Sequence, residues 1–273
     1  MSDTTAGSGI AETVAALQAN PAESALLFDI DGTLAPIRPD PEDVAVPGET
    51  QKLLRDLALR YALIACVTGR RSLDARRIVG VEELIYAGNH GLELLRPGAW
   101  DAEIDPAVAG GAGRARDFVL GLDAAEVSAV GFRVESKGPI QALHWREADD
   151  PDAAEAEARR IAHAAERANL VPHWGRRVLE IRPVAGIDKG TAVDRLVGEH
   201  HPRQALFGGD DRGDLAAFAT LDRLVETGRL RFAALVGVLS DEAPPELTEW
   251  ADVVVQGPEG FLEVLRELAR PGR

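Results

Sequence analysis

The sequence predicts an α/β protein: a parallel sheet with helices on both sides, plus a smaller α+β domain inserted into it. Short apolar runs alternate with segments of helical periodicity towards both ends of the chain, which is typical of a doubly wound parallel sheet. Between about residues 106 and 182 the predicted strands instead alternate apolar and polar residues, as half-exposed antiparallel strands do. We therefore expect an N-terminal extension (1–24), a first core section (25–106), an inserted domain (107–182) and a second core section (183–273).

The individual elements follow from local patterns. In the extension, Ile10, Val14 and Leu17 recur at helical spacing and predict a short amphipathic helix. The expected core elements are strands at 25–28, 62–67, 84–87, 205–207, 232–238 and 252–255, and helices near 53–57, at 73–79, 188–197, from 214, and at 260–268. The expected elements of the inserted domain are strands at 132–135, 141–145 and 178–181 and a helix at 151–168, which is rich in Ala and Glu and opens with proline.

The charge of the chain excludes several classes of partner. It has 45 Asp and Glu against 30 Lys and Arg, a net charge of −15, so we expect neither nucleic acid nor a membrane as a partner. A phosphorylated ligand would also be repelled, and a site for one therefore needs local positive charge. The first twenty residues lack the features of a signal or transit peptide and no long apolar stretch occurs, which predicts a soluble cytoplasmic protein.

Two carboxylates at spacing two follow the first predicted strand. Asp29 and Asp31 lie in the run Phe28-Asp29-Ile30-Asp31-Gly32-Thr33, at the carboxyl end of a buried strand, where ligands of open α/β sheets collect. This pattern is typical of a phosphoryl-transfer site, in which one carboxylate attacks phosphorus and the other moves protons. The alternative is a turn rich in aspartate without catalytic function.

Cationic and hydroxyl groups follow two other elements. Thr68, Gly69 and Arg70 come directly after the second strand, where a hydroxyl and backbone N–H groups can hold phosphoryl oxygens; alternatively, Thr68 or Ser72 caps the next helix. Lys189 precedes a helix and can direct a compact charge at the phosphoryl group and at the first aspartate. The alternative for this lysine is a solvated side chain in a first helical turn.

Three more carboxylates follow the strand at 205–207. Carboxylates are hard oxygen ligands of the kind that Mg2+ prefers. Mn2+ and Co2+ also bind to oxygen ligands. We expect Asp210 to bind the metal directly. Asp211 and Asp214 would orient Lys189 or metal-bound water, or cap the following helix.

The order of these motifs, each at a predicted strand end, resembles the haloacid dehalogenase superfamily of phosphatases. The resemblance implies a haloacid-dehalogenase-like Rossmannoid core, with the insertion as a cap domain that selects the substrate. It makes Asp29 the nucleophile and Asp31 the general acid and base, with Thr68 and Lys189 as phosphoryl binders. Asp29, the backbone carbonyl of Asp31 and Asp210 would hold Mg2+.

Further segments resemble the trehalose-6-phosphate phosphatases, over residues 25–265. These segments are 28–37, 89–93, 134–137 with His144 and Arg146, and 179–183 before 188–190. The resemblance implies hydrolysis of trehalose 6-phosphate to trehalose and phosphate, and includes association with a trehalose-phosphate synthase among the expected partners. The residues expected to bind the substrate are Gly69, Arg70, Asn89, His90, Glu93, Arg133, Glu135, Lys137, Glu180 and Arg182.

The charged strands of the insertion leave two interpretations open. Residues 133, 135 and 137 share one face of a strand, and residues 180 and 182 share one face of another. These faces either bind sugar hydroxyls or are simply solvated. Sucrose-phosphate and mannosyl-phosphoglycerate phosphatases, with a similar cap, are the alternative enzymes.

One segment departs from the family pattern. The paired aspartates are usually followed by a threonine and an acidic pair, whereas Gly213 and Leu215 stand in two of these positions here. We expect metal binding to persist but to be weaker. The departure motivates a further alternative, a non-catalytic sugar-phosphate sensor or partner of a synthase, against which the retention of Asp29 and Asp31 argues.

Overall fold

The computed structural model describes residues 3–38, 40–109, 111–175, 177–183, 186–240 and 243–271. The chain forms two compact units. One comprises Met1–Glu103 and Asp188–Arg273, and the other comprises Ile104–Ile187. Each is described by itself below.

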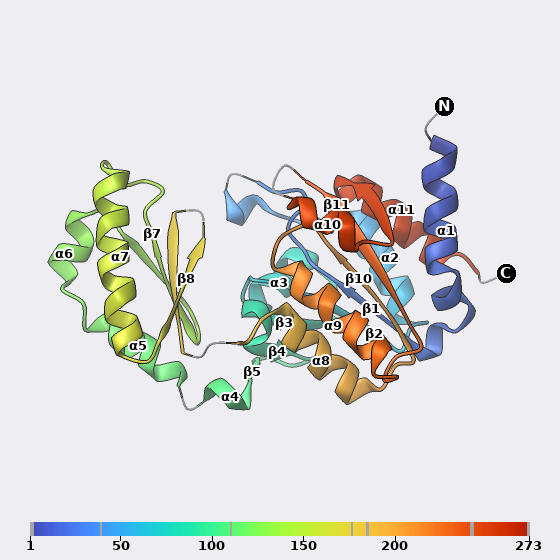
Figure 1. Ribbon diagram of the computed structural model, residues 1–273, viewed down its shortest axis with the longest axis horizontal. Helices are drawn as coiled ribbons and strands as arrows, with labels where there is room; N and C mark the ends of the chain where they lie inside the picture. Colours follow the sequence, from blue (N-terminus) through green and yellow to red (C-terminus); the bar gives the residue numbers. More distant parts are fainter. Residues whose placement is uncertain are drawn as a thin grey trace. The chain divides into compact units, whose positions relative to one another are not determined.

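The first unit is built on an eight-stranded sheet in the order β12-β11-β10-β1-β2-β3-β4-β5 (Figure 1). Its strands are β1 (Ser24–Phe28), β2 (Leu63–Val67), β3 (Ile85–Gly88), β4 (Glu93–Leu95), β5 (Glu103–Ile104), β10 (Gln204–Gly209), β11 (Phe232–Leu239) and β12 (Val253–Gln256). The pairs from β12 to β3 are parallel, which confirms the predicted parallel sheet. Strand β4 pairs with β3 in the antiparallel direction, an edge that the sequence analysis did not predict.

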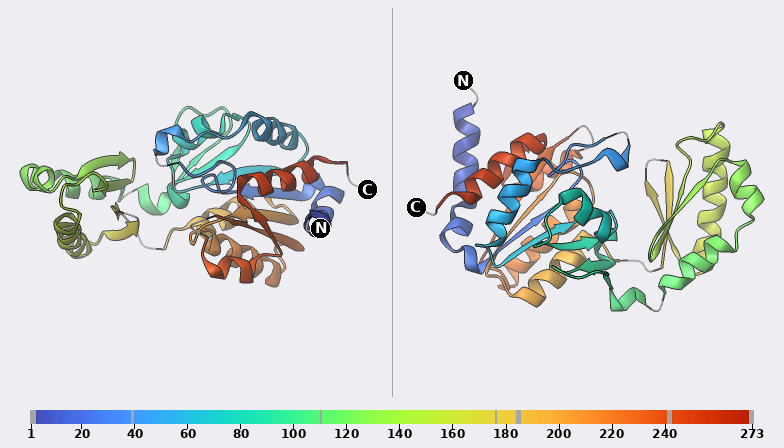
Figure 2. Two further views of the ribbon diagram at one scale, coloured as in Figure 1. Left: turned by 90° about the horizontal axis from the view of Figure 1, so that it is seen from above. Right: turned by 180° about the vertical axis from the view of Figure 1, so that it is seen from behind.

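Helices cover both faces of this sheet (Figure 2). They are α1 (Asp3–Ala19), α2 (Gly48–Ala58), α3 (Ser72–Val79), α8 (Lys189–His200), α9 (Asp214–Glu226), α10 (Pro245–Trp250) and α11 (Gly257–Ala269), with 3-10 turns η1 (Pro21–Glu23), η2 (Pro41–Asp43) and η3 (Asn89–Gly91). Alternate residues of β1 enter opposite cores: Leu26 and Phe28 pack with α1, α2, α3 and α11, and Ala25 and Leu27 pack with α8, α9 and α10. The uninterrupted apolar strands are therefore the consequence of burial on both faces.

The register of the parallel strands determines where the site lies. Phe28, the last residue of β1, pairs with Cys66 of β2 and with Gly208 of β10. The residues that follow these three strands therefore emerge at one edge of the sheet, at the carboxyl ends of its strands. Asp29 and Asp210 are among them.

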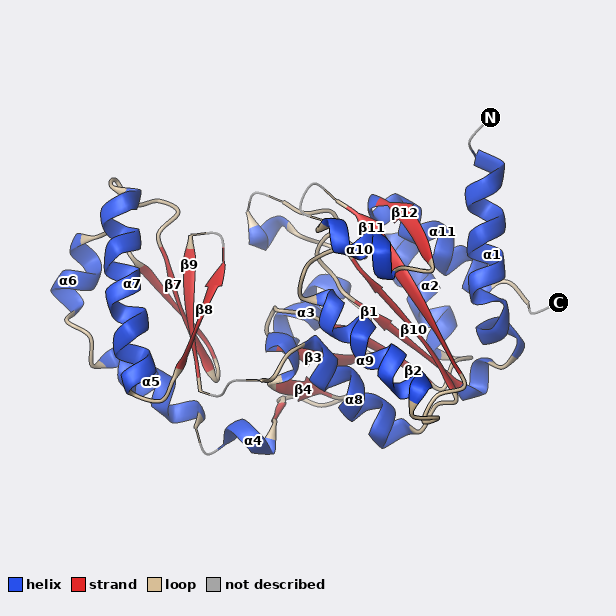
Figure 3. Ribbon diagram, in the orientation of Figure 1, coloured by secondary structure: helices blue, strands red, loops and turns tan. Residues whose placement is uncertain are grey.

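The second unit has a four-stranded antiparallel sheet in the order β6-β7-β9-β8. Its elements are α4 (Pro106–Ala109), α5 (Ala112–Leu120), α6 (Ala124–Ala129), β6 (Arg133–Lys137), β7 (Ile140–His144), α7 (Pro151–Arg167), β8 (Val171–Gly175) and β9 (Val178–Arg182). Leu143 and Leu179 of the sheet pack with Ala158 and Ile161 of α7, and α5, α6 and α7 lie to one side of the sheet (Figure 3). The other face carries the charged residues. No helix in the described ranges of either unit combines the length and the apolar composition needed to span a membrane.

Candidate active site

The turn after β1 holds the first aspartate against the neighbouring strand. Asp29 is 3% exposed, and its backbone N–H donates to the carbonyl of Gly208 at 2.9 Å. Gly32 has a φ of 87°, and a Cβ atom at this position would lie 2.2 Å from Oδ2 of Asp210. Glycine is thus required at residue 32 both by the backbone conformation and by the close approach of a second carboxylate.

Lys189 lies at the centre of a buried charge network. Its Nζ atom is 2.7 Å from Oδ1 of Asp214, 2.9 Å from Oδ1 of Asp29 and 3.5 Å from Oδ1 of Asp211. Burial favours the neutral amine, but the carboxylates of Asp214 and Asp29 outweigh it and raise the pKa of Lys189 well above its ordinary value. The lysine is therefore a fixed cation, and the solvated alternative considered from the sequence is wrong.

The start of α8 fixes the lysine in place. The Asp188 carboxylate accepts from the backbone N–H of Thr191 at 2.9 Å, and the two side chains form a capping box. At Gly190, an added Cβ atom would lie 2.5 Å from the carbonyl oxygen of Ala216 in α9. This close helix–helix contact sets the position from which Lys189 extends towards β1.

Asp214 serves as an anchor for both the lysine and the turn that precedes α9. Its Oδ1 accepts from Lys189, and its Oδ2 accepts from the backbone N–H groups of Asp210 and Asp211 at 2.9 and 3.0 Å. Asp211 in turn accepts from the N–H of Asp214 at 3.1 Å. The carboxylates of Asp211 and Asp214 therefore both contact Lys189. Asp211 also accepts from the N-terminus of α9.

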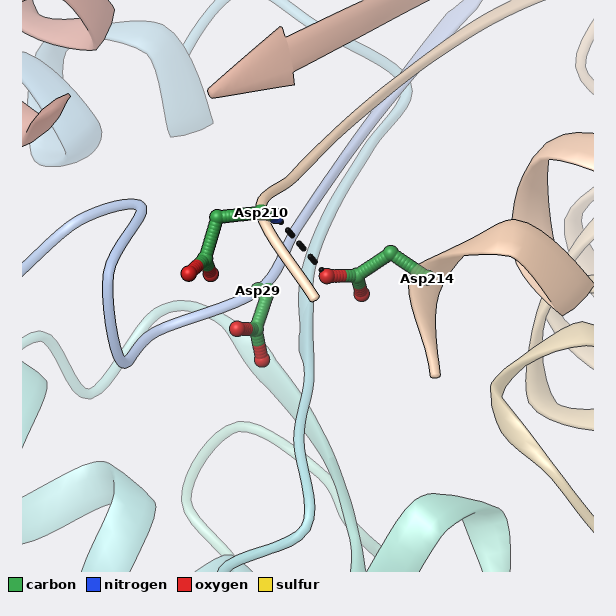
Figure 4. A group of neighbouring side chains, drawn as sticks. All are labelled: Asp29, Asp210 and Asp214. Atoms are coloured by element: carbon green, nitrogen blue, oxygen red, sulfur yellow. Dashed lines mark hydrogen bonds between the residues drawn. The ribbon is translucent and has the colours of Figure 1, made fainter. Parts of the chain in front are cut away.

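Three carboxylates converge at the strand edge (Figure 4). One ligand atom each from Asp29, Asp210 and Asp214 lies within 4.8 Å of the other two. Burial raises the pKa of Asp29 to about 8, against the opposing effect of Lys189, and raises the pKa of Asp210 to about 7. A concentration of buried carboxylate oxygens of this kind fits a divalent cation. Asp214 accepts from Lys189 and from two backbone N–H groups, whereas the partners of Asp210 are two hydroxyl groups, which can rotate; Asp29 and Asp210 are therefore better suited as ligands.

Two hydroxyl groups orient Asp210. Ser240 donates to Oδ2 at 2.9 Å and Thr33 donates to Oδ1 at 3.3 Å. Ser240 is not among the site residues predicted from the sequence. The sequence does contain a signal for this residue, because Ser240 directly follows β11 and polar residues that follow buried parallel strands lie at the same edge of the sheet.

Asp31 pairs with Arg70. The guanidinium Nε donates to Oδ2 of Asp31 at 2.7 Å and Nη2 donates to Oδ1 at 2.6 Å, while Nη1 donates to the carbonyl of Pro41 at 3.0 Å. The backbone N–H of Arg70 donates to Oγ1 of Thr68 at 3.2 Å. Thr68 thus stabilises its own loop, and the N-cap position of α3 is occupied by Arg71, not by Thr68 or Ser72.

The turn at η3 packs on this loop. Asn89 and His90 both have positive φ, 50° and 60°, and their N–H groups donate to the carbonyls of Arg70 and Thr68 at 2.7 and 2.8 Å. A Cβ atom at Gly69 would lie 2.8 Å from the His90 ring. Glycine at residue 69 therefore allows the imidazole to lie against the loop.

Glu93, which the sequence predicts to bind substrate, has a contact within the fold. It is buried, and its Oε1 accepts from the backbone N–H of Ser72 at 2.6 Å. A carboxylate at the first turn of a helix satisfies an N–H that has no partner within the helix and complements the helix dipole. The N-cap residue of α3 makes no side-chain hydrogen bond to the helix. Glu93, the first residue of β4, caps the start of α3 instead and so has a structural role.

The charged face of the second unit is a connected set of ion pairs. Glu180 lies between two cations, 3.0 Å from Nζ of Lys137 and 2.7 Å from Nη2 of Arg182. Glu135 pairs with Nε2 of His144 at 2.9 Å, and hydrogen bonding to His144 lowers the pKa of Glu135. Arg133 lies 4.0 Å from Glu135 and is largely exposed. Glu180 and Arg182 are 7% and 9% exposed, so this part of the face is not simply solvated.

A family model and several relatives identify the family of this chain. The trehalose-phosphatase family model matches residues 27–238. Probable trehalose-phosphate phosphatase 3 of Oryza sativa subsp. japonica is 30% identical over 277 residues, covering 95% of this chain and 72% of that protein. The trehalose-6-phosphate phosphatase of Escherichia coli K12 is 30% identical over 246 residues, covering 85% and 87%. The C-terminal domain of a C. albicans trehalose-6-phosphate phosphatase has a TM-score of 0.71 at 21% identity, covering 96% of both chains, which shows a shared fold.

The family match contains the whole charge network around Lys189, from Asp29 to Asp214. Since it extends over most of the sequence, this chain is a phosphatase that belongs to the trehalose-phosphatase family.

Proposed function

We propose that this chain hydrolyses trehalose 6-phosphate to trehalose and inorganic phosphate through an aspartyl phosphate on Asp29. The observation that carries the proposal is the buried ion pair between Asp29 and Lys189 at the carboxyl edge of the sheet, 2.9 Å apart. The neighbouring cation favours the ionised form of the Asp29 carboxylate, which is the form that attacks phosphorus, and is an electrostatic partner for the incoming phosphoryl group. The family of the chain supplies the substrate class.

The proposed reaction has two steps. A carboxylate oxygen of Asp29 forms a bond to phosphorus, the bond from phosphorus to the sugar oxygen breaks, and that oxygen takes a proton from Asp31. Water then attacks the phosphorus of the aspartyl phosphate, its proton passes to Asp31, and the carboxylate of Asp29 is released with inorganic phosphate. Lys189 and the loop with Thr68 and Gly69 hold the phosphoryl oxygens throughout.

A divalent cation fits the donor set that Asp29, the backbone carbonyl of Asp31 and Asp210 offer, and we propose Mg2+. When bound, it neutralises negative charge that develops on the phosphoryl group. The chain contributes the orientation of the ligands, because Ser240 and Thr33 hold the two oxygens of Asp210.

The charged face of the second unit is proposed to bind the disaccharide. Glu180, Lys137 and Arg182 present carboxylate and cationic hydrogen-bonding groups that are already ordered by their mutual ion pairs. Ordered charged groups of this kind can exchange some of their hydrogen bonds for sugar hydroxyls at a low cost in side-chain entropy. Arg133 and Glu135 extend the same face.

Phosphate release tests the proposal directly. The substrates are trehalose 6-phosphate, sucrose 6-phosphate, glucose 6-phosphate and 4-nitrophenyl phosphate, each with Mg2+ and with a chelator. We expect turnover that needs the metal and a clear preference for trehalose 6-phosphate. Preference for another sugar phosphate would contradict the substrate. If no ester turned over but trehalose 6-phosphate bound, the result would favour a sensor or a partner of a trehalose-phosphate synthase instead.

A further inference from the structure

Arg70 and Asp31 form a two-pronged ion pair beside the proposed nucleophile. Both carboxylate oxygens of Asp31 accept from the guanidinium, at 2.6 and 2.7 Å. The third guanidinium nitrogen, Nη1, donates to the carbonyl of Pro41. Each nitrogen of Arg70 therefore already donates to the protein, and this arrangement differs from the phosphate-binding role that the sequence suggested for Arg70.

The backbone of Arg70 is fixed on both sides. Its N–H donates to Thr68, and its carbonyl accepts from the N–H of Asn89 at 2.7 Å. The backbone of Asp31 is held as well, since Asp31 forms a bridge with Ala35 and the N–H of Gly32 donates to the carbonyl of Ala35 at 2.8 Å. With both backbones held, the direction of the Asp31 carboxylate depends on its side-chain torsions, which the arginine fork restricts.

We propose that Arg70 is a positioning residue for Asp31, which it holds in the orientation needed for proton transfer; this inference rests on the proposed phosphatase mechanism. The planar fork matches a carboxylate in both distance and direction. When Asp31 carries a proton, one oxygen no longer accepts, and the remaining N–H keeps the side chain in place. General acid–base catalysis depends on such placement, because the proton must pass over a hydrogen-bond distance.

The test is a double-mutant cycle on turnover of trehalose 6-phosphate. The variants are Arg70→Ala, Asp31→Asn and the combination of both. We expect Arg70→Ala to lower kcat by about 10- to 100-fold, part of the contribution typical of a general acid or base, with a change in KM of less than about threefold. In the Asp31→Asn background the same substitution should lower kcat by less than about threefold, because two residues that act as one unit are not additive.

Two further readouts separate positioning from phosphate binding. Arg70→Lys keeps the charge but not the fork, so it should recover only part of the lost kcat. With 4-nitrophenyl phosphate, whose leaving group needs no proton, Arg70→Ala should release a burst of nitrophenolate equal to the enzyme concentration, because only the later attack by water is slowed. The inhibition constant of inorganic phosphate should stay within about threefold of the wild-type value.

Arg77→Ala is the matched control. Arg77 pairs with Glu42 at 3.2 Å, in the same η2 turn that receives Nη1 of Arg70, and both partners are exposed. It should retain wild-type kinetics. An equal loss of kcat from Arg70→Ala with and without Asp31, or a tenfold weaker inhibition by phosphate, would overturn the positioning role while leaving the proposed function intact. Absence of turnover in the wild-type chain would overturn both.

Discussion

The Nζ atom of Lys189 lies 2.9 Å from Oδ1 of Asp29, and the two side chains are only 2% and 5% exposed. Lys189 also pairs with Asp214, which is fully buried. A buried charge without a partner is far more costly than a paired one, so Lys189 offsets part of the cost of burying two carboxylates, and the two carboxylates offset the cost of burying the lysine. The same side chain thus contributes to folding and, in the proposed mechanism, to catalysis.

Replacing Lys189 by alanine should weaken both properties. We expect the free energy of unfolding to fall by about 3–5 kcal/mol, because Asp29 and Asp214 lose their buried partner. Turnover should fall by about 10²- to 10³-fold through the loss of electrostatic stabilisation. Urea denaturation and phosphate release measure the two effects. Lys52→Ala, which removes an exposed pair with Asp56, should change neither, and an unchanged kcat in Lys189→Ala would contradict the catalytic role.

Replacing Asp29 by asparagine should abolish turnover without unfolding the chain. The amide cannot attack phosphorus, while Lys189 keeps Asp214 and Asp211 as partners. When a chelator keeps the protein free of metal, burial raises the pKa of the Asp29 carboxyl from its ordinary value of 3.8 to about 8. A raised carboxyl pKa in the folded state means that stability is lost as the pH rises between these values.

The side chain of the Asp29→Asn variant carries no ionisable group, so this variant does not lose stability through residue 29 as the pH rises. Between pH 5 and pH 8, the melting temperature of Asp29→Asn should therefore rise relative to that of the wild-type chain. Thermal unfolding at several pH values in the presence of chelator measures this difference. A difference that does not depend on pH would show that Asp29 is not protonated in the folded, metal-free protein.

Glu93 should be more important for stability than a surface glutamate. Replacing it by alanine removes the partner of the Ser72 N–H in α3, and loss of a helix cap costs about 0.5–2 kcal/mol. Urea denaturation measures the effect. Glu82→Ala is the matched control, because Glu82 pairs with Arg76 of the same helix at 3.4 Å but is 72% exposed; its effect should stay within about 0.5 kcal/mol. Equal effects of the two substitutions would remove the capping role.

The positions of the strand ends could be predicted from the sequence because short apolar runs, such as those at 25–28 and 205–207, mark buried parallel strands. This placed Asp29 and Asp210 at one edge without any knowledge of side-chain contacts. The partners of Arg70 and Glu93 could not be predicted in this way, because Asp31 and Ser72 lie 39 and 21 residues away. Such contacts depend on how loops pack, and they leave no periodic signal.

Elements without a pattern of their own were also missed. Strand β4 has only three residues, too few for an alternation to be recognised. Strand β8 contains Pro172, which argues against a central strand, and the structure places β8 at the edge of its sheet, where proline is tolerated. In both cases the position is determined by neighbouring strands and not by local propensity.

Glu180 offers the sharpest test of the proposed sugar site. Its carboxylate lies between Lys137 and Arg182, and all three side chains are mostly buried. Glu180→Ala should raise the KM for trehalose 6-phosphate by about tenfold or more, equivalent to the loss of one or more hydrogen bonds to a charged group. It should leave hydrolysis of 4-nitrophenyl phosphate unchanged, since this small ester has no sugar hydroxyls to bind.

The two substrates separate recognition from folding in this variant. Alanine at residue 180 leaves Lys137 and Arg182 without their shared anion, so some loss of stability is expected from the second unit itself. Glu166→Ala, which removes an exposed pair with His163 in α7 of the same unit, controls for the loss of a charge. If Glu180→Ala slowed both esters by the same factor, the residue would be structural. If the KM for the disaccharide phosphate rose while hydrolysis of 4-nitrophenyl phosphate stayed unchanged, the charged face would be a part of the chain that binds the sugar.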